Sequence, residues 1–545
     1  MPTFEFSFKD FKKLVGKKLP NDEEKLWELL LKVKTEVEEL KGDSLKLELA
    51  DTNRPDMWCV EGLSRALKGA LEIETGLDNY SCIKSGKEII VEKSIDNIRP
   101  FIAGAIIKDL KLDNEIIKQL IQLQLKLDTT FGRSRKKSSI GIYDFDLIKF
   151  PIHYKALNPE DIVFTPLGFN KNMNALQILE EHPKGIEFGK ILQEHDKYPV
   201  LIDSDNRILS LPPIINSNTL GKVTTKTKNV FVEVTGTHLK TVMGALNIIA
   251  STLIERKGKA ENITVNYGKH KIITPDFSTK EFSIKKSSIK RRLGLDLTDS
   301  KIKELLRMAR FDVKTIGKEK IVVLIPFYRT DIMHEVDVIE DIGIMYGYEG
   351  IDSNPVNIST NGSLHEITEY NEKVRNIVVG MEYQEVLTYT RTDKEVLENE
   401  DCVEIANLIG TKMNCLRNEL IPGLLEFLSK NTHYEYPQKI FEIGTIFNKK
   451  KSKIAEEEHL CLISTHLNAD FTESKQALEW IMNNLRINYE IKQEDNEYYI
   501  QGRCGTIVVK GKKVGSFGEI NPRLLSKFNL ENPAISIELN IEKIK

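Results

Sequence analysis

Acidic side chains gather between residues 326 and 349, in the stretch PFYRTDIMHEVDVIEDIGIMYGYE. Its second half has a helical pattern in which three carboxylates stand at i, i+3 and i+4: Asp337, Glu340 and Asp341. On a helix with 3.6 residues per turn these side chains project into one narrow sector. Asp331 precedes the helix, so it either reaches in from the turn or acts as the N-cap. Because like charges repel at this spacing, solvent, a basic partner or a hard cation must compensate them.

A second candidate is a carboxylate in an apolar run. Glu233 lies in VFVEV, residues 230–234, a run apolar enough to form a buried strand. A buried carboxylate needs either a partner or a function. An ion pair with the nearby Lys222 is the simpler interpretation, and a binding role is the alternative. No set of Ser, His and Asp, or of Cys and His, stands out as a nucleophile.

Two other charged stretches are candidates for binding phosphates. Arg133 and Arg135 lie with two lysines on a loop rich in glycine and serine, which either faces solvent or holds phosphates. Arg417 and Glu419 stand near the end of a predicted strand, before a leucine-rich helix. This arrangement is similar to the ATP-binding element of class II aminoacyl-tRNA synthetases. The glycine run followed by arginine that such enzymes use is missing, so a packed strand and helix is the safer interpretation.

The composition limits the class of protein. A chain of 545 residues is too long for one core and predicts three to five domains. The 78 basic and 81 acidic residues give no overall attraction to nucleic acid, so any RNA contact must come from local patches. The six cysteines are scattered, which indicates reduced thiols in a cytoplasm. Neither a signal peptide nor a membrane-spanning run is visible, so we expect a soluble cytoplasmic protein.

Local signals predict the elements that position these residues. Phe4, Phe6 and Phe8 alternate as on a strand. The stretch TDSKIKELLRMARF predicts a helix with Thr298 as its N-cap. In DTNRPDMWCVEGLSRAL a tight turn precedes a helix that Asp56 is expected to cap.

Several of these phrases together resemble one family, the beta subunit of phenylalanine–tRNA ligase in its archaeal and eukaryotic-cytosolic form. DTNRPDMWCVEGLSRAL resembles its N-terminal signature, and GRSRKKSSIGIYDFD, LSLPPIINS and VFVEVTGT resemble its editing domain. PFYRTDIMHEVDVIEDIGIMYGYEGI resembles the magnesium-associated B-five domain, and CLRNELIPGLLEFLSKN with KIFEIGTIF resembles the catalytic-like domain. The match follows the correct order over nearly the whole chain.

The resemblance implies a multidomain α/β and α+β fold with four parts. These are an N-terminal α/β domain, an editing domain, a winged-helix-like B-five domain and a degenerate class II synthetase core with an antiparallel sheet. We place them at residues 1–85, 86–268, 269–350 and 351–545.

The resemblance also implies partners and site residues. The family forms an α2β2 heterotetramer that uses ATP to attach phenylalanine to tRNA(Phe), with the working active site in the alpha subunit. The beta subunit hydrolyses mischarged Tyr-tRNA(Phe), because a phenylalanine pocket rejects tyrosine only weakly. Glu233 is then the candidate acceptor for the phenol, and a positioned water would hydrolyse the ester. Asn216, Ser217 and Thr235 are candidate lining residues.

For the acidic stretch the resemblance implies Mg²⁺, which prefers oxygen ligands and keeps several waters. The implied ligands are Asp331, Asp337, Glu340 and Asp341. The alternative is an interface in which these acids pair with basic residues.

Two other classes of function stay open. The first is a non-catalytic RNA-binding or assembly subunit that has lost editing. The second is a DNA-binding regulator built on the winged-helix-like segment. Acids at Asp296, Asp299 and Glu304 disfavour this second class, because they would repel a phosphate backbone.

Overall fold

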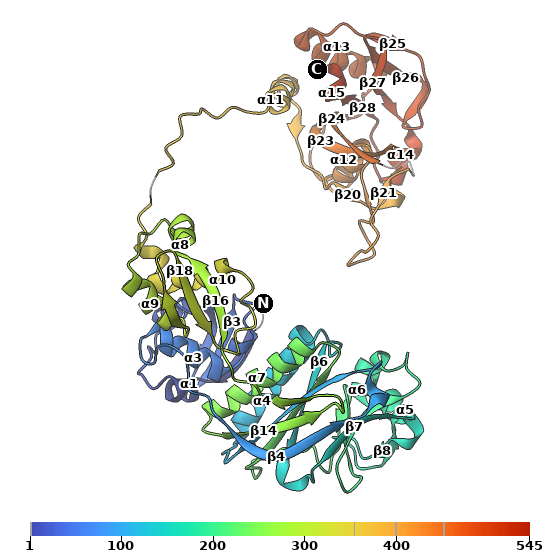
Figure 1. Ribbon diagram of the computed structural model, residues 1–545. Helices are drawn as coiled ribbons and strands as arrows, with labels where there is room; N and C mark the ends of the chain where they lie inside the picture. The colour runs from blue at the N-terminus through green and yellow to red at the C-terminus, as the bar shows by residue number, and fades with distance from the viewer. Residues whose placement is uncertain (1–2, 354, 398–400, 451–452) are drawn as a thin grey trace. The chain divides into compact units, whose positions relative to one another are not determined.

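The strand that carries Glu233, β13 (Val230–Gly236), lies inside a ten-stranded sheet (Figure 1). Along the sheet the strands follow the order β12-β11-β10-β7-β4-β14-β5-β13-β6, and β15 pairs with β14. β4 pairs in parallel with β14 and β7, and the other pairs are antiparallel. The remaining strands are β4 (Cys82–Val91), β5 (Phe101–Lys108), β6 (Ser138–Asp144), β7 (Ile152–Leu157), β10 (Tyr198–Ile202), β11 (Ile208–Leu211), β12 (Ile215–Asn216), β14 (Lys259–Asn266) and β15 (Lys271–Thr274).

The alternation of β13 gives its two faces different roles. Val230, Val232 and Val234 point to one side, where they share a core with α4 (Asn114–Lys126) and α7 (Leu239–Glu255). Phe231, Glu233 and Thr235 point to the other side. This second face is also covered by the protein, and Glu233 is only 2% exposed. Two short helices, α5 (Ala175–Glu181) and α6 (Pro183–Phe188), and the strands β8 (Val163–Phe164) and β9 (Met173–Asn174) complete this part.

The N-terminal part is a three-stranded sheet with helices. It contains β1 (Thr3–Ser7), α1 (Phe8–Val15), α2 (Glu23–Leu31), β2 (Thr35–Lys41), β3 (Ser44–Leu49) and α3 (Val60–Ala70), with sheet order β1-β3-β2. Phe4 and Phe6 are buried on β1 as predicted, whereas Phe8 already begins α1. The predicted cap is wrong, because Cys59 caps α3 through its sulfur and Asp56 lies in the preceding turn. Asp56 is instead buried against Arg54, whose Nε donates to it at 2.8 Å.

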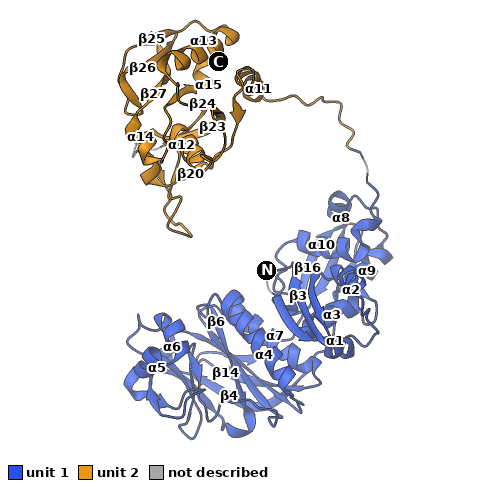
Figure 2. Ribbon diagram, turned by 180° about the vertical axis from the view of Figure 1, so that it is seen from behind, with its two compact units in different colours: residues 1–355 blue, residues 356–545 orange. Residues whose placement is uncertain are grey.

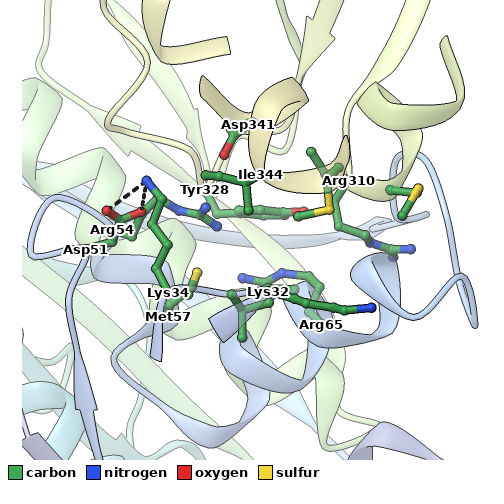
Figure 3. A pocket seen from close by; sticks show the side chains of 15 residues that line it. Lys32, Lys34, Asp51, Arg54, Met57, Arg65, Arg310, Tyr328, Asp341 and Ile344 are labelled. Atoms are coloured by element: carbon green, nitrogen blue, oxygen red, sulfur yellow. Dashed lines mark hydrogen bonds and ion pairs between the residues drawn. The ribbon is translucent and has the colours of Figure 1, made fainter. Parts of the chain in front are cut away.

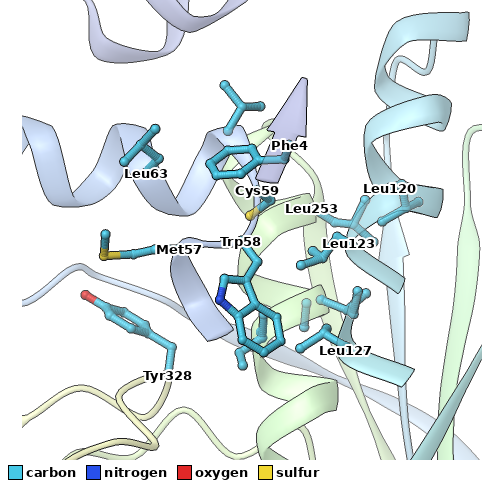
Figure 4. Packing of buried hydrophobic residues seen from close by; sticks show 14 of the residues in the cluster. Phe4, Met57, Trp58, Cys59, Leu63, Leu120, Leu123, Leu127, Leu253 and Tyr328 are labelled. Carbon is cyan, nitrogen blue, oxygen red and sulfur yellow. The ribbon is translucent and has the colours of Figure 1, made fainter. Parts of the chain in front are cut away.

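The N-terminal part and the part built on the ten-stranded sheet share one hydrophobic core (Figure 4). Trp58, just before α3, lies among Leu120 and Leu123 of α4 and Leu253 of α7. Tyr328, which precedes the acidic helix, joins the same cluster. Residues predicted to belong to three domains are therefore packed together as one unit, residues 1–355.

The segment with the acidic helix has its own small sheet, in the order β16-β18-β17. Its elements are β16 (Lys280–Lys285), α8 (Lys286–Leu293), α9 (Asp299–Met308), β17 (Asp312–Ile316), β18 (Lys320–Ile325) and α10 (Glu335–Tyr346). The cap predicted for α9 is confirmed, since the Thr298 hydroxyl accepts a hydrogen bond from the Lys301 amide. A core of Ile302, Leu305 and Leu306 packs α9 against α10.

Residues 356–545 form the second unit (Figure 2). Its main sheet has seven strands in the order β19-β23-β24-β28-β27-β26-β25, antiparallel except for the β19–β23 pair, and a small sheet has the order β20-β22-β21. The elements are α11 (Glu366–Val379), β19 (Gln384–Glu385), β20 (Arg391–Thr392), β21 (Val403–Glu404), β22 (Cys415–Leu416), α12 (Ile421–Ser429), β23 (Gln438–Lys450), β24 (Lys453–Thr465), α13 (Phe471–Leu485), β25 (Glu490–Lys492), β26 (Tyr499–Val509), β27 (Lys512–Ile520), α14 (Pro522–Lys527), β28 (Ala534–Asn540) and α15 (Ile541–Ile544).

These descriptions come from a computed structural model that describes residues 3–353, 355–397, 401–450 and 453–545. In these ranges no helix combines the length and apolar character that a membrane span requires.

Candidate functional site

A cavity of about 310 Å³ opens beside Glu233. Helix α4 forms one wall with Ile117, Leu120 and Ile121, and the turn between β11 and β12 forms another with Pro212 and Pro213. The polar residues in its lining are Gln124, Arg135, Ser139, Lys184, Ser210, Asn216, Lys222 and Glu233. The size and the largely apolar wall with a few polar groups are typical of a small-molecule pocket. None of the described residues that line it is a histidine or a cysteine.

Glu233 belongs to the lining of this cavity, and one of its two carboxylate oxygens has no protein partner. Its Oε1 accepts a hydrogen bond of 3.0 Å from the Tyr143 hydroxyl, while its Oε2 is buried and accepts none. Burial raises the pKa of the Glu233 carboxyl to about 8, although the hydrogen bond from Tyr143 and the charge of Arg99 oppose this rise. The ion pair predicted with Lys222 is not formed: Lys222 lines the same cavity but its side chain is exposed.

The other three predicted pocket residues differ in their positions. Asn216 lines the cavity, and its Oδ1 lies 3.3 Å from the Tyr143 hydroxyl. Ser217 is buried beside the cavity lining and bonds to Thr219 and to the backbone. Thr235 is fully buried, and its hydroxyl accepts a hydrogen bond from Arg99 Nε at 3.0 Å. The structure thus brings Glu233 and Asn216 together in the cavity and gives Ser217 and Thr235 partners within the protein.

Arg135 is a pocket residue that the sequence did not single out for this role. The predicted phosphate-binding or solvated loop contains it, yet its side chain is 8% exposed and turns inward. Its Nη1 donates to the backbone carbonyls of Pro213 and Ile214 at 2.9 and 2.8 Å, and its Nε lies 3.1 Å from Asp128. Arg135 therefore holds the turn that forms one wall of the cavity. Burial raises the pKa of its partner Asp128 to about 7, and the charge of Arg135 opposes that rise.

The acidic helix begins with a different cap from the one considered in the sequence. His334 is the N-cap of α10, and Asp337 closes a capping box by accepting from the amides of Met333 and His334 at 2.8 and 2.7 Å. Asp331 is therefore not the cap. Asp337, which the resemblance assigns to a metal, satisfies two backbone donors at the start of the helix.

The other three acids pair with basic residues. Arg329 Nη2 donates to Asp331 at 2.7 Å and to Asp341 at 2.6 Å, in a buried site. Burial opposes its charge, but the carboxylates of Asp341 and Asp331 raise the pKa of the Arg329 guanidinium. Glu340 accepts from Lys34 of the N-terminal part at 2.8 Å. In the described part of the chain, no group of three or more His, Cys, Asp or Glu side chains is arranged to hold a metal ion.

Figure 3 shows the surroundings of Asp341, at a cavity of about 30 Å³ where the N-terminal part meets α10. Lys34 points toward Asp51, to which it donates at 3.0 Å, and Arg54 lies beside them. The Arg65 guanidinium stacks on the Tyr328 ring, 3.9 Å from its centroid. Glu340 thus joins α10 to the N-terminal part by an ion pair, whereas Asp341 pairs with Arg329 of its own part.

Known proteins match this chain along its whole length. The phenylalanine–tRNA ligase beta subunit of Pyrococcus furiosus is 40% identical over 558 aligned positions, which cover 100% of both chains. The chain belongs to the phenylalanine–tRNA ligase beta subunit family. The beta subunit of Methanosphaera stadtmanae is 36% identical with the same coverage.

Family models agree with this beta-subunit assignment. One described as "Phenylalanyl tRNA synthetase beta chain CLM domain" matches residues 351–541, and one described as "tRNA synthetase B5 domain" matches residues 282–348. The crystal structure of an N-terminal fragment of the phenylalanyl-tRNA synthetase beta subunit from Pyrococcus horikoshii is also similar. Its TM-score is 0.62 at 43% identity, and the match covers 64% of this chain and 100% of the fragment.

In the second unit of this beta-subunit chain, the predicted ATP-binding-like arginine is engaged within the protein. Arg417 is 5% exposed, and its Nη1 donates to Glu442 at 2.6 Å and to the Thr388 hydroxyl at 2.9 Å. Its Nε donates to the Thr445 carbonyl at 2.9 Å. Glu419 bonds to the Tyr498 hydroxyl. The interpretation of Arg417 and Glu419 as parts of a packed strand and helix agrees with these contacts.

Proposed function

We propose that this chain acts in the cytoplasm as the beta subunit of a phenylalanine–tRNA ligase, in an α2β2 complex that charges tRNA(Phe). Family membership over the full length supports this role. ATP and phenylalanine bind in the alpha subunit, and the second unit of this chain is a catalytic-like domain that binds no ATP. The engagement of Arg417 with Glu442 supports this division, since a guanidinium already paired in a buried site is not available for a phosphate.

Equilibrium dialysis of ATP against the full-length chain without its alpha subunit tests the division of labour. We expect no binding at micromolar ATP. Retention of ATP at that concentration would refute the assignment of the second unit as inactive.

Within the complex, this chain hydrolyses Tyr-tRNA(Phe). The observation that carries this proposal is the buried Oε2 of Glu233, which has no protein partner and belongs to a residue that lines a cavity of about 310 Å³. A buried polar atom without a partner is costly, so a ligand that supplies a donor is favoured there. The phenol of a tyrosyl group can supply this hydrogen bond, as a donor to the ionised carboxylate or as an acceptor from the protonated carboxyl, and a phenyl group can do neither.

The same oxygen explains why correctly charged tRNA would be spared. A phenylalanyl group entering the cavity would leave the buried Oε2 without a hydrogen bond. Sites that are built to bond a substrate hydroxyl reject the analogue without it by about 10⁴-fold or more. Asn216 extends the polar side of the cavity. The lining offers no histidine or cysteine nucleophile among the described residues, so a positioned water, assisted by the tRNA terminus, attacks the ester.

Replacement of Glu233 by alanine in the assembled complex tests this proposal. Hydrolysis of Tyr-tRNA(Phe) should fall while ATP-dependent phenylalanylation continues at the wild-type rate. Unchanged deacylation would refute the role of Glu233. A wild-type complex without deacylase activity would instead favour the alternative, a subunit that binds RNA and assembles the enzyme but no longer edits.

Magnesium stays a prediction of the family resemblance. As the structure arranges them, the four predicted ligands do not fit one shared ion, because Asp331 and Asp341 bind Arg329, Glu340 binds Lys34 and Asp337 caps α10. No step of the proposed function therefore depends on the ion.

A further inference from the structure

We infer that Tyr143 positions the Glu233 carboxylate for recognition of the phenol, and that Gly141 provides the space in which the two side chains meet. This inference rests on the proposed editing function and adds a positioning residue to it. Three independent features of strands β6 and β13 carry the argument: their register, the hydrogen bonds of the Tyr143 hydroxyl and the close approach at Gly141.

The register of the two strands places Glu233 opposite a residue without a side chain. β13 pairs with β6 so that Glu233 stands opposite Gly141 and Phe231 stands opposite Tyr143. Tyr143 is therefore a diagonal neighbour of Glu233 on the same face of the sheet. The Tyr143 side chain reaches Glu233 only if residue 141, which stands next to both, has no side chain.

Gly141 keeps that position empty. A Cβ atom built on Gly141 would overlap both Glu233 Oε1 and the Tyr143 hydroxyl. The backbone of Gly141 does not have positive φ, so the glycine is not required by the conformation of the strand. Gly141 is instead needed because it has no side chain, which leaves room for the Tyr143 hydroxyl and the Glu233 carboxylate to meet next to it.

The Tyr143 hydroxyl is held in place from several sides. Its ring stacks on Phe231, with centroids 5.6 Å apart and planes at 28°. Its oxygen lies 3.0 Å from Glu233 Oε1 and 2.8 Å from the Ser210 hydroxyl. A tyrosine hydroxyl has one hydrogen to donate and can also accept. Ser210, Asn216 and Glu233 all lie within reach of this one hydrogen, with Asn216 Oδ1 the farthest at 3.3 Å. If the Ser210 hydroxyl turns to donate to Tyr143, the tyrosine hydrogen is left for Glu233 and fixes Oε1.

Fixing Oε1 determines what remains for a ligand. With Tyr143 bonded to Oε1, the other oxygen, Oε2, is the one left without a partner. The carboxyl group cannot turn to satisfy both oxygens with the same hydroxyl. Tyr143 therefore leaves one carboxyl oxygen oriented for one hydrogen-bonding group of a ligand, which is the requirement for selecting a tyrosyl over a phenylalanyl group.

The variant Tyr143→Phe removes the hydroxyl and keeps the ring on Phe231. A hydrogen bond corresponds to roughly a 3- to 100-fold effect, with the larger values for an ionised partner, so kcat/KM for deacylation of Tyr-tRNA(Phe) should fall by a factor in that range in the assembled complex. Tyr267→Phe is the matched control, because the Tyr267 hydroxyl bonds to the backbone of Ile102 in the same sheet. The control should deacylate like the wild type.

A double-mutant cycle separates positioning from a general loss of structure. In the Glu233→Ala background, Tyr143→Phe should change deacylation by less than about twofold, because the group that it positions is gone. If the two substitutions multiply instead, Tyr143 acts independently of Glu233 and the inference is wrong. If Glu233→Ala alone has no effect, the proposed function fails. If Glu233→Ala lowers deacylation and Tyr143→Phe does not, only this inference fails.

Gly141→Ala tests the same arrangement without removing a hydrogen-bonding group. If Tyr143→Phe does not fold, this variant provides the test of whether Tyr143 positions Glu233. The added methyl group forces Glu233 and Tyr143 apart, so deacylation of Tyr-tRNA(Phe) should fall while the first unit, which contains Gly141, still unfolds cooperatively and phenylalanylation is retained. Wild-type deacylation by a folded Gly141→Ala complex would contradict the inference.

Discussion

Replacing Glu233 with glutamine should change how the stability of the protein depends on pH. Burial raises the pKa of this carboxyl from 4.5 to about 8. The charge of Asp128 adds to the rise, whereas the hydrogen bond from Tyr143 and the charge of Arg99 act against it. The glutamine variant removes the titrating carboxyl and keeps these three neighbours.

The sign and size of the effect follow from proton linkage. Between pH 4.5 and about 8 the folded protein holds a proton on Glu233 that the unfolded chain has released, so stability decreases as the pH rises. The contribution is fully present below pH 4.5 and is lost as the pH passes about 8. At about 1.4 kcal/mol for each pH unit in this window, the loss is at most about 5 kcal/mol. The glutamine variant lacks this titration and should gain stability relative to the wild type as the pH rises.

Urea unfolding of the full-length protein at about pH 5 and about pH 8 measures this difference. Asp128 is present in both proteins, so the comparison reports the titration of Glu233 together with its coupling to Asp128. Glu180→Gln, at an exposed position of α5, is the control and should follow the wild type at both pH values. An identical pH dependence in the wild type and the Glu233→Gln variant would refute the conclusion that Glu233 is buried without a compensating charge.

Three other outcomes are expected. Arg329→Met removes the cation of the buried Asp341 and leaves Asp331 only the more distant Arg54, at 3.9 Å. It should destabilise the first unit by about 3–5 kcal/mol in urea unfolding, and a loss below about 1 kcal/mol would contradict the ion-pair network. The acids of α10 already pair with basic residues or cap the helix, so calorimetric titration of the wild type with Mg²⁺ should give no heat of binding. Heat of binding that disappears in the Asp337→Ala variant would establish the metal site instead. Arg135→Met removes the donor to the two carbonyls of the cavity wall, so it should raise KM for deacylation of Tyr-tRNA(Phe) more than it lowers kcat in steady-state kinetics. An unchanged KM would contradict the role of Arg135 in holding this wall.

Local signals in the sequence predicted local structure well. The Thr298 cap depends on an amide three residues away, and the structure confirms it. The apolar run around Glu233 predicted a buried strand, which is β13. Where several nearby residues compete for one role, the sequence did not decide between them: Cys59 caps α3 in place of Asp56, and His334 caps α10 in place of Asp331.

Partners distant in the chain were beyond the reach of sequence patterns. Tyr143 meets Glu233 across 90 positions, and this contact depends on the register of β6 against β13. The predicted partner Lys222 is closer in sequence but exposed. Likewise, the periodicity of α10 placed three acids in one sector, but only the packing of the N-terminal part shows that Lys34 compensates Glu340.

Deacylation of Tyr-tRNA(Phe) by this chain assembled with its alpha subunit tests the central proposal most directly. The wild-type complex should hydrolyse Tyr-tRNA(Phe) and spare Phe-tRNA(Phe), and the Glu233→Ala complex should lose the first activity while it still charges tRNA(Phe) with phenylalanine. A wild-type complex that charges tRNA(Phe) but leaves Tyr-tRNA(Phe) intact would contradict the account.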